Sequence, residues 1–290
     1  MEKIIGTVPG KCRKKREKAR LTLNNNPEIS WHMKKSRRTY NGVHLNKKSN
    51  TQDVVEQSLT IMPNHVTNRL EINADRETVQ KVMNFLKGKT DDDNTPCYID
   101  FNNIIPMPEE LLIEKSSSGD LGMKYLEAMQ LKPFYFLLDD DALRTIQWIE
   151  GLAEKDRKEA LQLGASYLEN RKKYGYPTWY EWSTATWGTK WNAYHQDFEE
   201  PNILWFDTAW NGVPLLIQKL SEIFPDVEFH YAYADEDLGF NTGRGTARNG
   251  EINMTIPEGR SNEAFEIMFF VKPGMDEYFE LTDEGYKWVS

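Results

Sequence analysis

The chain is poor in cysteine. Its 290 residues include only Cys12 and Cys97, which lie far apart in the sequence. Two distant cysteines exclude a disulfide scaffold, a zinc site built on paired cysteines, and an iron–sulfur cluster, which needs about four ligands. Such sparse use of cysteine is typical of a reducing compartment, so we expect a protein of the cytoplasm.

Long hydrophobic runs and catalytic signatures are also missing. No stretch of about 18 apolar residues occurs, and no hydrophobic region follows the basic residues near the N-terminus. We therefore expect neither a membrane partner nor a secretory signal. The sequence contains no HExxH pair, no G-x-S-x-G elbow and no cysteine–histidine pairing. We predict no catalytic residue and no cofactor.

The net charge of −9 conceals two segments of opposite sign. Residues 1–61 carry fourteen Lys or Arg and five Asp or Glu, whereas residues 62–290 have a net charge of −18. The first segment lacks sustained apolar periodicity and cannot bury enough surface to offset the entropy of ordering it. We therefore predict a basic, mostly disordered extension over 1–61 and an acidic folded domain over 62–290.

A first β-α-β pattern opens at Met62, where the character of the sequence changes. Apolar residues alternate over 66–72, which predicts a strand. Asp75 is a typical N-cap for an amphipathic helix that ends near Lys87. Residues 98–105 have the composition of a second strand, and we expect a right-handed crossover between the two.

A second and clearer β-α-β pattern covers 203–235. A strand is predicted at 203–208, an apolar stripe at helical spacing follows over 213–224, and 227–233 alternates as a strand. Residues 108–176, between the two patterns, are predicted to form a long helical insertion. Two β-α-β units with such an insertion predict an α+β fold, a ferredoxin-like split β-α-β sandwich.

Four short motifs resemble a known family. They are residues 62–68 (MPNHVTN), 104–108 (IIPMP), 187–193 (WGTKWNA) and 206–210 (FDTAW). Together they are similar to the YubB-type proteins of phages and plasmids, whose domains are ferredoxin-like, and the resemblance covers about 62–270. It implies a mobile-element origin, a bacterial host cell and the same fold, but no activity.

The resemblance also bears on the N-terminal segment. Members of that family open at the methionine that matches Met62. Residues 1–61 are therefore either a genuine basic extension or the product of a start codon placed too far upstream, and the resemblance slightly favours the second explanation.

Tryptophan is concentrated in one segment. Residues 177–195 hold four of the nine tryptophans, namely Trp179, Trp182, Trp187 and Trp191. The first two are expected in a partly exposed loop, where with Lys190 they form a candidate ligand-binding site that stacks nucleobases or sugar rings. The last two are expected on the inner face of a core strand over 187–193. The alternative for all four is that they fill the core.

A glycine-rich stretch provides a second candidate site. Arg244 lies between Gly243 and Gly245, and Arg248 follows closely. Backbone N–H groups and guanidinium groups in such a loop could hold a phosphate. The alternative is a mobile glycine loop without a ligand.

Three acidic residues are weak candidates for a metal site. Asp207 lies at the end of one predicted strand, and Asp235 and Asp237 follow the end of another. Their carboxylates could converge on a divalent cation, which prefers oxygen ligands. Acidic residues at strand ends also commonly cap turns, and no loop of ligand-spaced carboxylates is present.

Three functions are compatible with these features. We expect a non-enzymatic accessory protein of a phage or plasmid that binds a host protein or a small molecule, for example to counter a host defence. The first alternative is nucleic-acid binding through the basic residues of 1–61 and the aromatic loop, which the charge of −18 on the rest of the chain opposes. The second alternative is a nucleotide-processing or hydrolytic enzyme.

Overall fold

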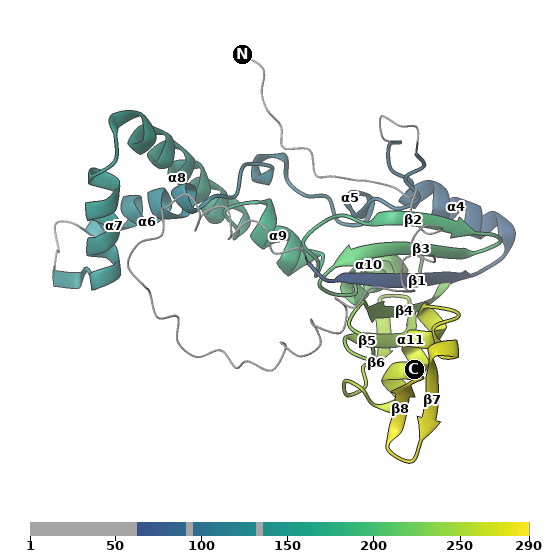
Figure 1. Ribbon diagram of the computed structural model, residues 1–290. Helices are drawn as coiled ribbons and strands as arrows, with labels where there is room; N and C mark the ends of the chain where they lie inside the picture. Colours follow the sequence, from purple (N-terminus) through teal and green to yellow (C-terminus); the bar gives the residue numbers. More distant parts are fainter. Residues whose placement is uncertain (1–62, 91–94, 132–135, 290) are drawn as a thin grey trace.

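A six-stranded sheet forms the centre of the computed structural model, which describes residues 63–90, 95–131 and 136–289. Its strand order is β2-β3-β1-β4-β5-β6, and every pair of neighbours is antiparallel (Figure 1). The predicted extension over 1–61 lies outside the described residues.

The elements have the following bounds. The strands of the sheet are β1 (His65–Asn73), β2 (Tyr194–Glu199), β3 (Ile203–Ala209), β4 (Glu228–Asp235), β5 (Thr242–Arg248) and β6 (Glu251–Thr255). The α-helices are α4 (Arg76–Leu86), α5 (Phe101–Ile104), α6 (Ser117–Leu131), α7 (Asp140–Glu150), α8 (Glu154–Tyr174), α9 (Trp179–Thr186), α10 (Pro214–Ile223) and α11 (Asn262–Val271). A separate two-stranded ribbon contains β7 (Phe279–Thr282) and β8 (Gly285–Trp288).

The strand order confirms the predicted ferredoxin-like α+β fold. In the first split unit the chain runs from β1 through α4 to β2, and in the second it runs from β3 through α10 to β4. Each unit leaves room for one strand of the other, so β1 lies between β3 and β4. The β5-β6 hairpin then extends the sheet beyond β4.

The inner face of the sheet, which α4 and α10 cover, holds the larger core. Asp75 caps α4 as predicted, because its carboxylate accepts hydrogen bonds from the backbone N–H groups of Glu77 and Thr78. Proline at the first position of α10 fits the helix start, where no N–H partner is needed.

A buried hydrogen-bond network joins α10 to the sheet. The Tyr231 hydroxyl donates to Oδ1 of Asn68 at 2.5 Å and accepts from the backbone N–H of Val213 at 2.6 Å. The amide of Asn68 donates in turn to Oγ1 of Thr208 at 2.8 Å and to the carbonyl of Val66 at 2.9 Å. These contacts satisfy polar groups that would otherwise be costly to bury.

The outer face is only partly covered. Helix α11, capped by Ser261, packs against β4, β5 and β1. It can lie close to the sheet because Ala232 and Ala234 are the outward residues of β4 beneath it, where Phe265 and Met268 contact them in a second, smaller core. The part of this face beyond α11 carries charged side chains.

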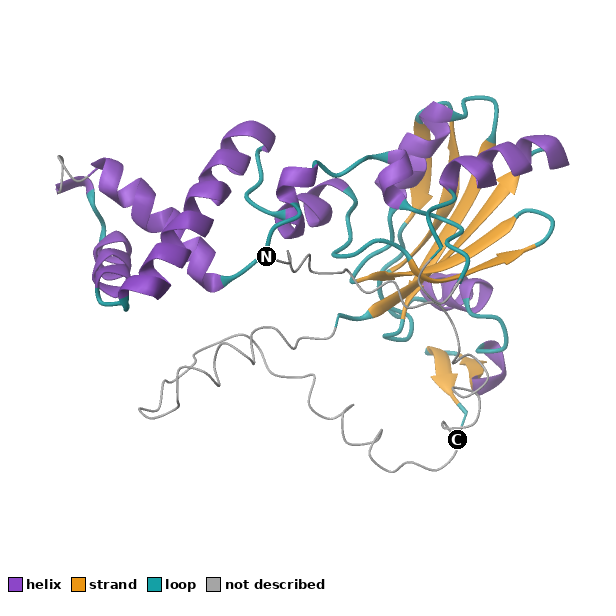
Figure 2. Cartoon of the chain, turned by 90° about the horizontal axis from the view of Figure 1, so that it is seen from above, coloured by secondary structure: helices purple, strands orange, loops and turns teal. Residues whose placement is uncertain are grey.

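Helices α6, α7 and α8 lie apart from the sheet (Figures 1 and 2). Glycines allow α6 and α8 to approach closely, since a Cβ on Gly122 would lie 2.0 Å from the carbonyl oxygen of Ala160, and one on Gly164 would meet the backbone of Gly122. Residues 117–119 form the first turn of α6, and Gly119 packs against the ring of Tyr167.

The predicted strand at 98–105 is wrong. Asp100 accepts a hydrogen bond from the N–H of Asn102 and caps the short helix α5. Ile99, Phe101 and Ile104 are buried, so the apolar residues that suggest a strand point into the core from a turn of helix. The first β-α-β unit is therefore completed only at β2, after the helices α6 to α9.

The predicted core strand at 187–193 is also wrong. Gly188 has a φ of +79°, which interrupts extended backbone. In this segment, side chains take the place of the backbone hydrogen bonds between strands. The Thr189 hydroxyl donates to the carbonyl of Ala209, and Oδ1 of Asn192 accepts from the N–H of Phe101. The strand begins only at Tyr194.

Replacing Tyr231 with phenylalanine tests the buried network. Tyr231→Phe removes one hydroxyl and leaves Oδ1 of Asn68 and the N–H of Val213 without this partner. We expect the free energy of unfolding in urea to fall by about 1–3 kcal/mol.

The matched control is Tyr233→Phe on the same face of β4. Within the described residues its hydroxyl has no hydrogen-bond partner, so its loss should change the unfolding free energy by less than about 0.5 kcal/mol. Equal effects of the two substitutions would contradict a role for the network.

Candidate functional site

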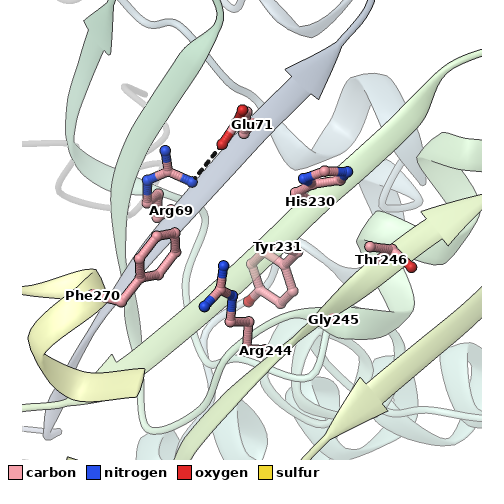
Figure 3. Close-up of a pocket in the computed structure, with 8 residues that line it drawn as sticks. All are labelled: Arg69, Glu71, His230, Tyr231, Arg244, Gly245, Thr246 and Phe270. Atoms are coloured by element: carbon pink, nitrogen blue, oxygen red, sulfur yellow. Dashed lines mark hydrogen bonds and ion pairs between the residues drawn. The ribbon is translucent and has the colours of Figure 1, made fainter. Parts of the chain in front are cut away.

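An open hollow of about 250 Å³ lies on the outer face of the sheet, beside the end of α11 (Figure 3). Its lining residues come from β1, β4, β5 and α11, and they are Arg69, Glu71, His230, Tyr231, Arg244, Gly245, Thr246 and Phe270. Two arginines and one histidine give it a basic character.

The register of the sheet places both arginines. Arg69 of β1 and Arg244 of β5 are each paired with Ala232 of β4, so the three residues form one row across the sheet. Paired residues point to the same face, and neighbouring strands are about 4.8 Å apart. The two arginines therefore project from the outer face about 10 Å apart at the backbone, with only a methyl group between them.

Phe270 of α11 enters the space above Ala232. Its ring centroid lies 4.6 Å from Cζ of Arg69 and 4.0 Å from Cζ of Arg244. Figure 3 shows the phenyl ring between the two guanidinium groups. Cation–π contact of this kind orients an arginine without using its N–H donors. The ring thus holds both side chains in place for a further partner.

The charges within the hollow are unbalanced. Nη1 of Arg69 forms an ion pair with Glu71 at 2.8 Å, and the Arg69 side chain is only 11% exposed. Arg244 is exposed, and no carboxylate of the described chain lies within ion-pair distance of it. Two guanidinium groups therefore face one carboxylate.

The next row of the sheet carries polar groups. Glu71, His230 and Thr246 are paired across β1, β4 and β5. The ring of His230 bonds Glu228 through Nε2 at 2.6 Å. This hydrogen bond, followed by that from Asn73, lowers the pKa of the Glu228 carboxyl. The row adds a hydroxyl and an imidazole beside the arginines.

This arrangement suits an oxyanion. Guanidinium groups bind carboxylate and phosphate through paired N–H donors, and such charge-assisted hydrogen bonds are stronger than neutral ones. Thr246 adds a hydroxyl at the rim. The lining supplies a binding surface for an anionic group.

Of the five residues predicted to bind a ligand, only Arg244 lines the hollow. Arg248 is the next residue after Thr246 that points outward from β5, but it does not line the hollow. Trp179, Trp182 and Lys190 are also absent from its lining. The structure therefore does not bring the five together in one cleft.

The tryptophans differ from their predicted placement. Trp182 belongs to helix α9 rather than to an exposed loop, and it is buried, with its ring 5.2 Å from that of Trp187. A stacking role for Trp182 is therefore wrong, because its ring fills the inner core. Trp179 is half-buried at the start of the same helix, and Trp191 is half-buried in the turn that follows.

Two of the three acidic candidates, Asp207 and Asp235, lie near Lys272. Both carboxylate oxygens of Asp235 accept hydrogen bonds, Oδ1 from Asn64 at 3.0 Å and Oδ2 from Asn241 at 2.8 Å. Lys272 donates through Nζ to the carbonyl of Asp235. The backbone N–H of Asp237 bonds Oδ1 of Asp235 at 2.9 Å, so this segment closes a turn.

Lys272 supplies positive charge at this end of the sheet. Burial lowers the pKa of its ammonium group, while the charges of Asp235, Asp207 and Glu236 act in the opposite direction. Asp207 also bonds Nδ1 of His195 at 2.9 Å. Across residues 63–90, 95–131 and 136–289, no three His, Cys, Asp or Glu side chains are grouped to hold a metal ion.

No sequence motif indicates the roles of Arg69, Phe270 and Lys272. The alternation of β1 places Arg69 on its outward side, but nothing local indicates that it faces Arg244 across β4. Phe270 lies in the last turn of α11, and Lys272 directly follows that helix. Their roles depend on how the helix lies on the sheet.

The family match agrees with the ferredoxin-like fold. Residues 186–272 match the family described as the ferredoxin-like domain in Api92-like protein, a stretch that contains β2 to α11. Among solved structures the chain is similar to a protein Api92 from Yersinia pseudotuberculosis, with 12% identity over 67% of this chain and 98% of that chain. The TM-score is 0.34, so the fold assignment depends on the strand order and the family match. No curated protein matches the chain.

Over residues 186–272, the family match supports a resemblance to Api92-like proteins. Within the described ranges, no helix combines the length and apolar character needed to cross a membrane.

Asp235→Asn tests whether this acidic residue is structural. In this variant an amide nitrogen replaces one carboxylate oxygen that now accepts a hydrogen bond from Asn64 or Asn241. Two N–H donors then face each other at a residue that is only 4% exposed. We expect the free energy of unfolding to fall by about 1–3 kcal/mol. Asp237→Asn is the control, because its backbone N–H still bonds Asp235, and it should shift stability by less than about 0.5 kcal/mol. Unchanged stability of Asp235→Asn, or stabilisation of the parent protein by magnesium, would contradict the structural role.

Proposed function

We propose that the protein is a non-enzymatic accessory protein that binds an anionic group of its partner in the hollow on the outer sheet face. One observation carries the proposal: Arg69 and Arg244 project from one row of the sheet and are oriented by the ring of Phe270 between them. A carboxylate or phosphate complements this pair.

The lining favours binding over catalysis. Tyr231 directs its hydroxyl into the buried network with Asn68 and Val213. His230 is engaged with Glu228. An activated nucleophile needs a hydrogen bond to a base. Among the described residues of the lining, the Thr246 hydroxyl forms no hydrogen bond to His230 or to Glu71, the two groups that could act as that base.

Two sources could supply the anionic group. A small molecule with a carboxylate or phosphate and an acidic side chain of a host protein present the same chemistry to the arginines. The resemblance of four motifs to the YubB-type proteins of phages and plasmids supports the proposal of a role in a mobile element, within the cytoplasm of a bacterial host. The nucleic-acid alternative depends mainly on residues 1–61, which lie outside the described residues.

Glu71 acts as an internal competitor in this proposal. Its carboxylate already accepts a hydrogen bond from Arg69, in the way that a bound anion would. A ligand must displace Glu71 or share the guanidinium with it. The net positive charge of the hollow, and hence its affinity, is set by this one carboxylate.

Two substitutions of opposite effect test the proposal. Calorimetric titration with inorganic phosphate and with a short oligoglutamate peptide should show affinity reduced about tenfold in Arg244→Gln, since one charged hydrogen bond contributes about 1.5–3 kcal/mol. Glu71→Gln should bind more tightly than the parent protein, because the competing charge is gone. Preference for phosphate would identify a small molecule, and preference for the peptide an acidic partner protein.

Arg248→Gln is the matched control. It removes the same charge from the same face of β5, but outside the hollow. Binding should then weaken only slightly, through long-range charge. Equal weakening by Arg244→Gln and Arg248→Gln would reduce the effect to net charge and overturn the proposed site.

A further inference from the structure

Three half-buried tryptophans gather at one end of the sheet. Trp179 comes from α9, Trp191 from the turn before β2, and Trp210 from the residue after β3. The buried indoles of Trp187 and Trp205 donate through Nε1 to protein acceptors. In the described part of the chain, the indole N–H groups of the three half-buried tryptophans have no such acceptor. They are therefore available to a ligand.

The rings are connected in space. The ring of Tyr180 lies edge-on to that of Trp210, with centroids 6.1 Å apart, and Trp179 lies edge-on to Tyr180 at 5.8 Å. The ammonium group of Lys190 lies 4.7 Å from the ring centroid of Trp191 and 5.3 Å from that of Trp210. We name these five residues the aromatic platform. Motifs 187–193 and 206–210 meet at its centre.

The backbone of Trp210 is held in an unusual conformation. Its φ is +74°, in the left-handed region that a bulky side chain rarely adopts. The Trp210 N–H donates to the carbonyl of Asn64 at 2.9 Å, and its carbonyl accepts from Asn241 at 2.8 Å. Strain of this kind persists where the surroundings fix it, often at a binding site. Here it presents a large indole at the surface.

Lys190 gives the platform a positive charge without a protein counter-charge. Within the described residues, no carboxylate lies within ion-pair distance of its ammonium group. Burial against the indoles lowers its pKa, and no neighbouring charge contributes to that shift. An ammonium group between flat rings therefore remains open to an external anion.

We propose that the aromatic platform binds one nucleotide, with the base stacked on the indole and phenol rings and the phosphate on Lys190. Aromatic side chains stack any nucleobase through its π-face, and a nearby cation pairs with the phosphate. A neutral sugar would use the rings but not the charge. Glu236 and Asp237 lie near the loop that holds Trp210, which disfavours a long polyanion and favours a single nucleotide.

This site is separate from the hollow. Trp210 directly follows the end of β3 at Ala209, whereas Trp205, which contacts Arg69, lies four residues before that end, so about 14 Å of strand separates the two regions. The proposal does not depend on anion binding by the arginines. Failure of either one leaves the other intact.

The experiment titrates the full chain with adenosine monophosphate, adenosine, inorganic phosphate and an oligoadenylate of about twelve nucleotides. We expect adenosine monophosphate to bind, and to bind more tightly than adenosine or phosphate alone. Trp210→Gly removes the indole at a position where glycine suits the backbone, and should weaken this binding about tenfold or more. Lys190→Gln should bring the affinity down to that of adenosine, and Lys190→Arg should restore it.

Two controls separate the platform from other surfaces. Trp148→Ala removes an exposed indole from α7 and should leave nucleotide affinity unchanged. Because the hollow is itself proposed to bind phosphate, the titrations are repeated in an Arg244→Gln background, where the weakening by Trp210→Gly and by Lys190→Gln should persist. Tighter binding of the oligoadenylate would identify single-stranded nucleic acid as the source of the nucleotide, and equal or weaker binding would identify a free nucleotide. Binding that is absent, that survives both Trp210→Gly and Lys190→Gln, or that is replaced by binding of a neutral maltooligosaccharide would overturn the proposal.

Discussion

Strand β1 is hydrogen-bonded along both of its sides, and this double pairing fixes which side chains enter the buried network and which line the hollow. One edge of β1 pairs with β3 and the other with β4. Because side chains alternate between faces, Asn68 enters the buried network while its neighbour Arg69 projects into the hollow. A shift of one residue would exchange the two and bury a guanidinium group in the inner core, so the core and the hollow enforce the same register.

The outer face depends on small residues as much as on charged ones. Ala232 and Ala234 let α11 lie close to β4, and Ala232 leaves the space that Phe270 enters. A larger residue at 232 would push the phenyl ring away from both guanidinium groups. The hollow is therefore a consequence of how α11 packs. The ring of Phe270 contacts both guanidinium groups, and Arg69 is held in addition by its ion pair with Glu71.

The sequence predicts those parts of the structure whose causes are local. The apolar stripe of α10, the cap Asp75 and the alternation of β4 are local patterns, and the structure contains them. The strand predicted over 98–105 is wrong because a short capped helix with a buried side has an apolar composition similar to that of a buried strand. Arg244 could be selected from its glycine neighbours, whereas Arg69 and Phe270 join it only through pairing across β4 and the placement of α11.

The acidic strand ends show why residue type alone misleads. Asp207 and Asp235 do lie near one charged group, as a metal site would require, but Lys272 provides that charge within the chain. Its ammonium group has lost part of its hydration, and the surrounding carboxylates compensate for that loss. The same reasoning applies in reverse to Lys190 and Arg244, where no carboxylate of the described chain compensates. An uncompensated cation that is fixed by aromatic rings is the feature that both proposed sites share, and it directs each of them toward an anionic ligand.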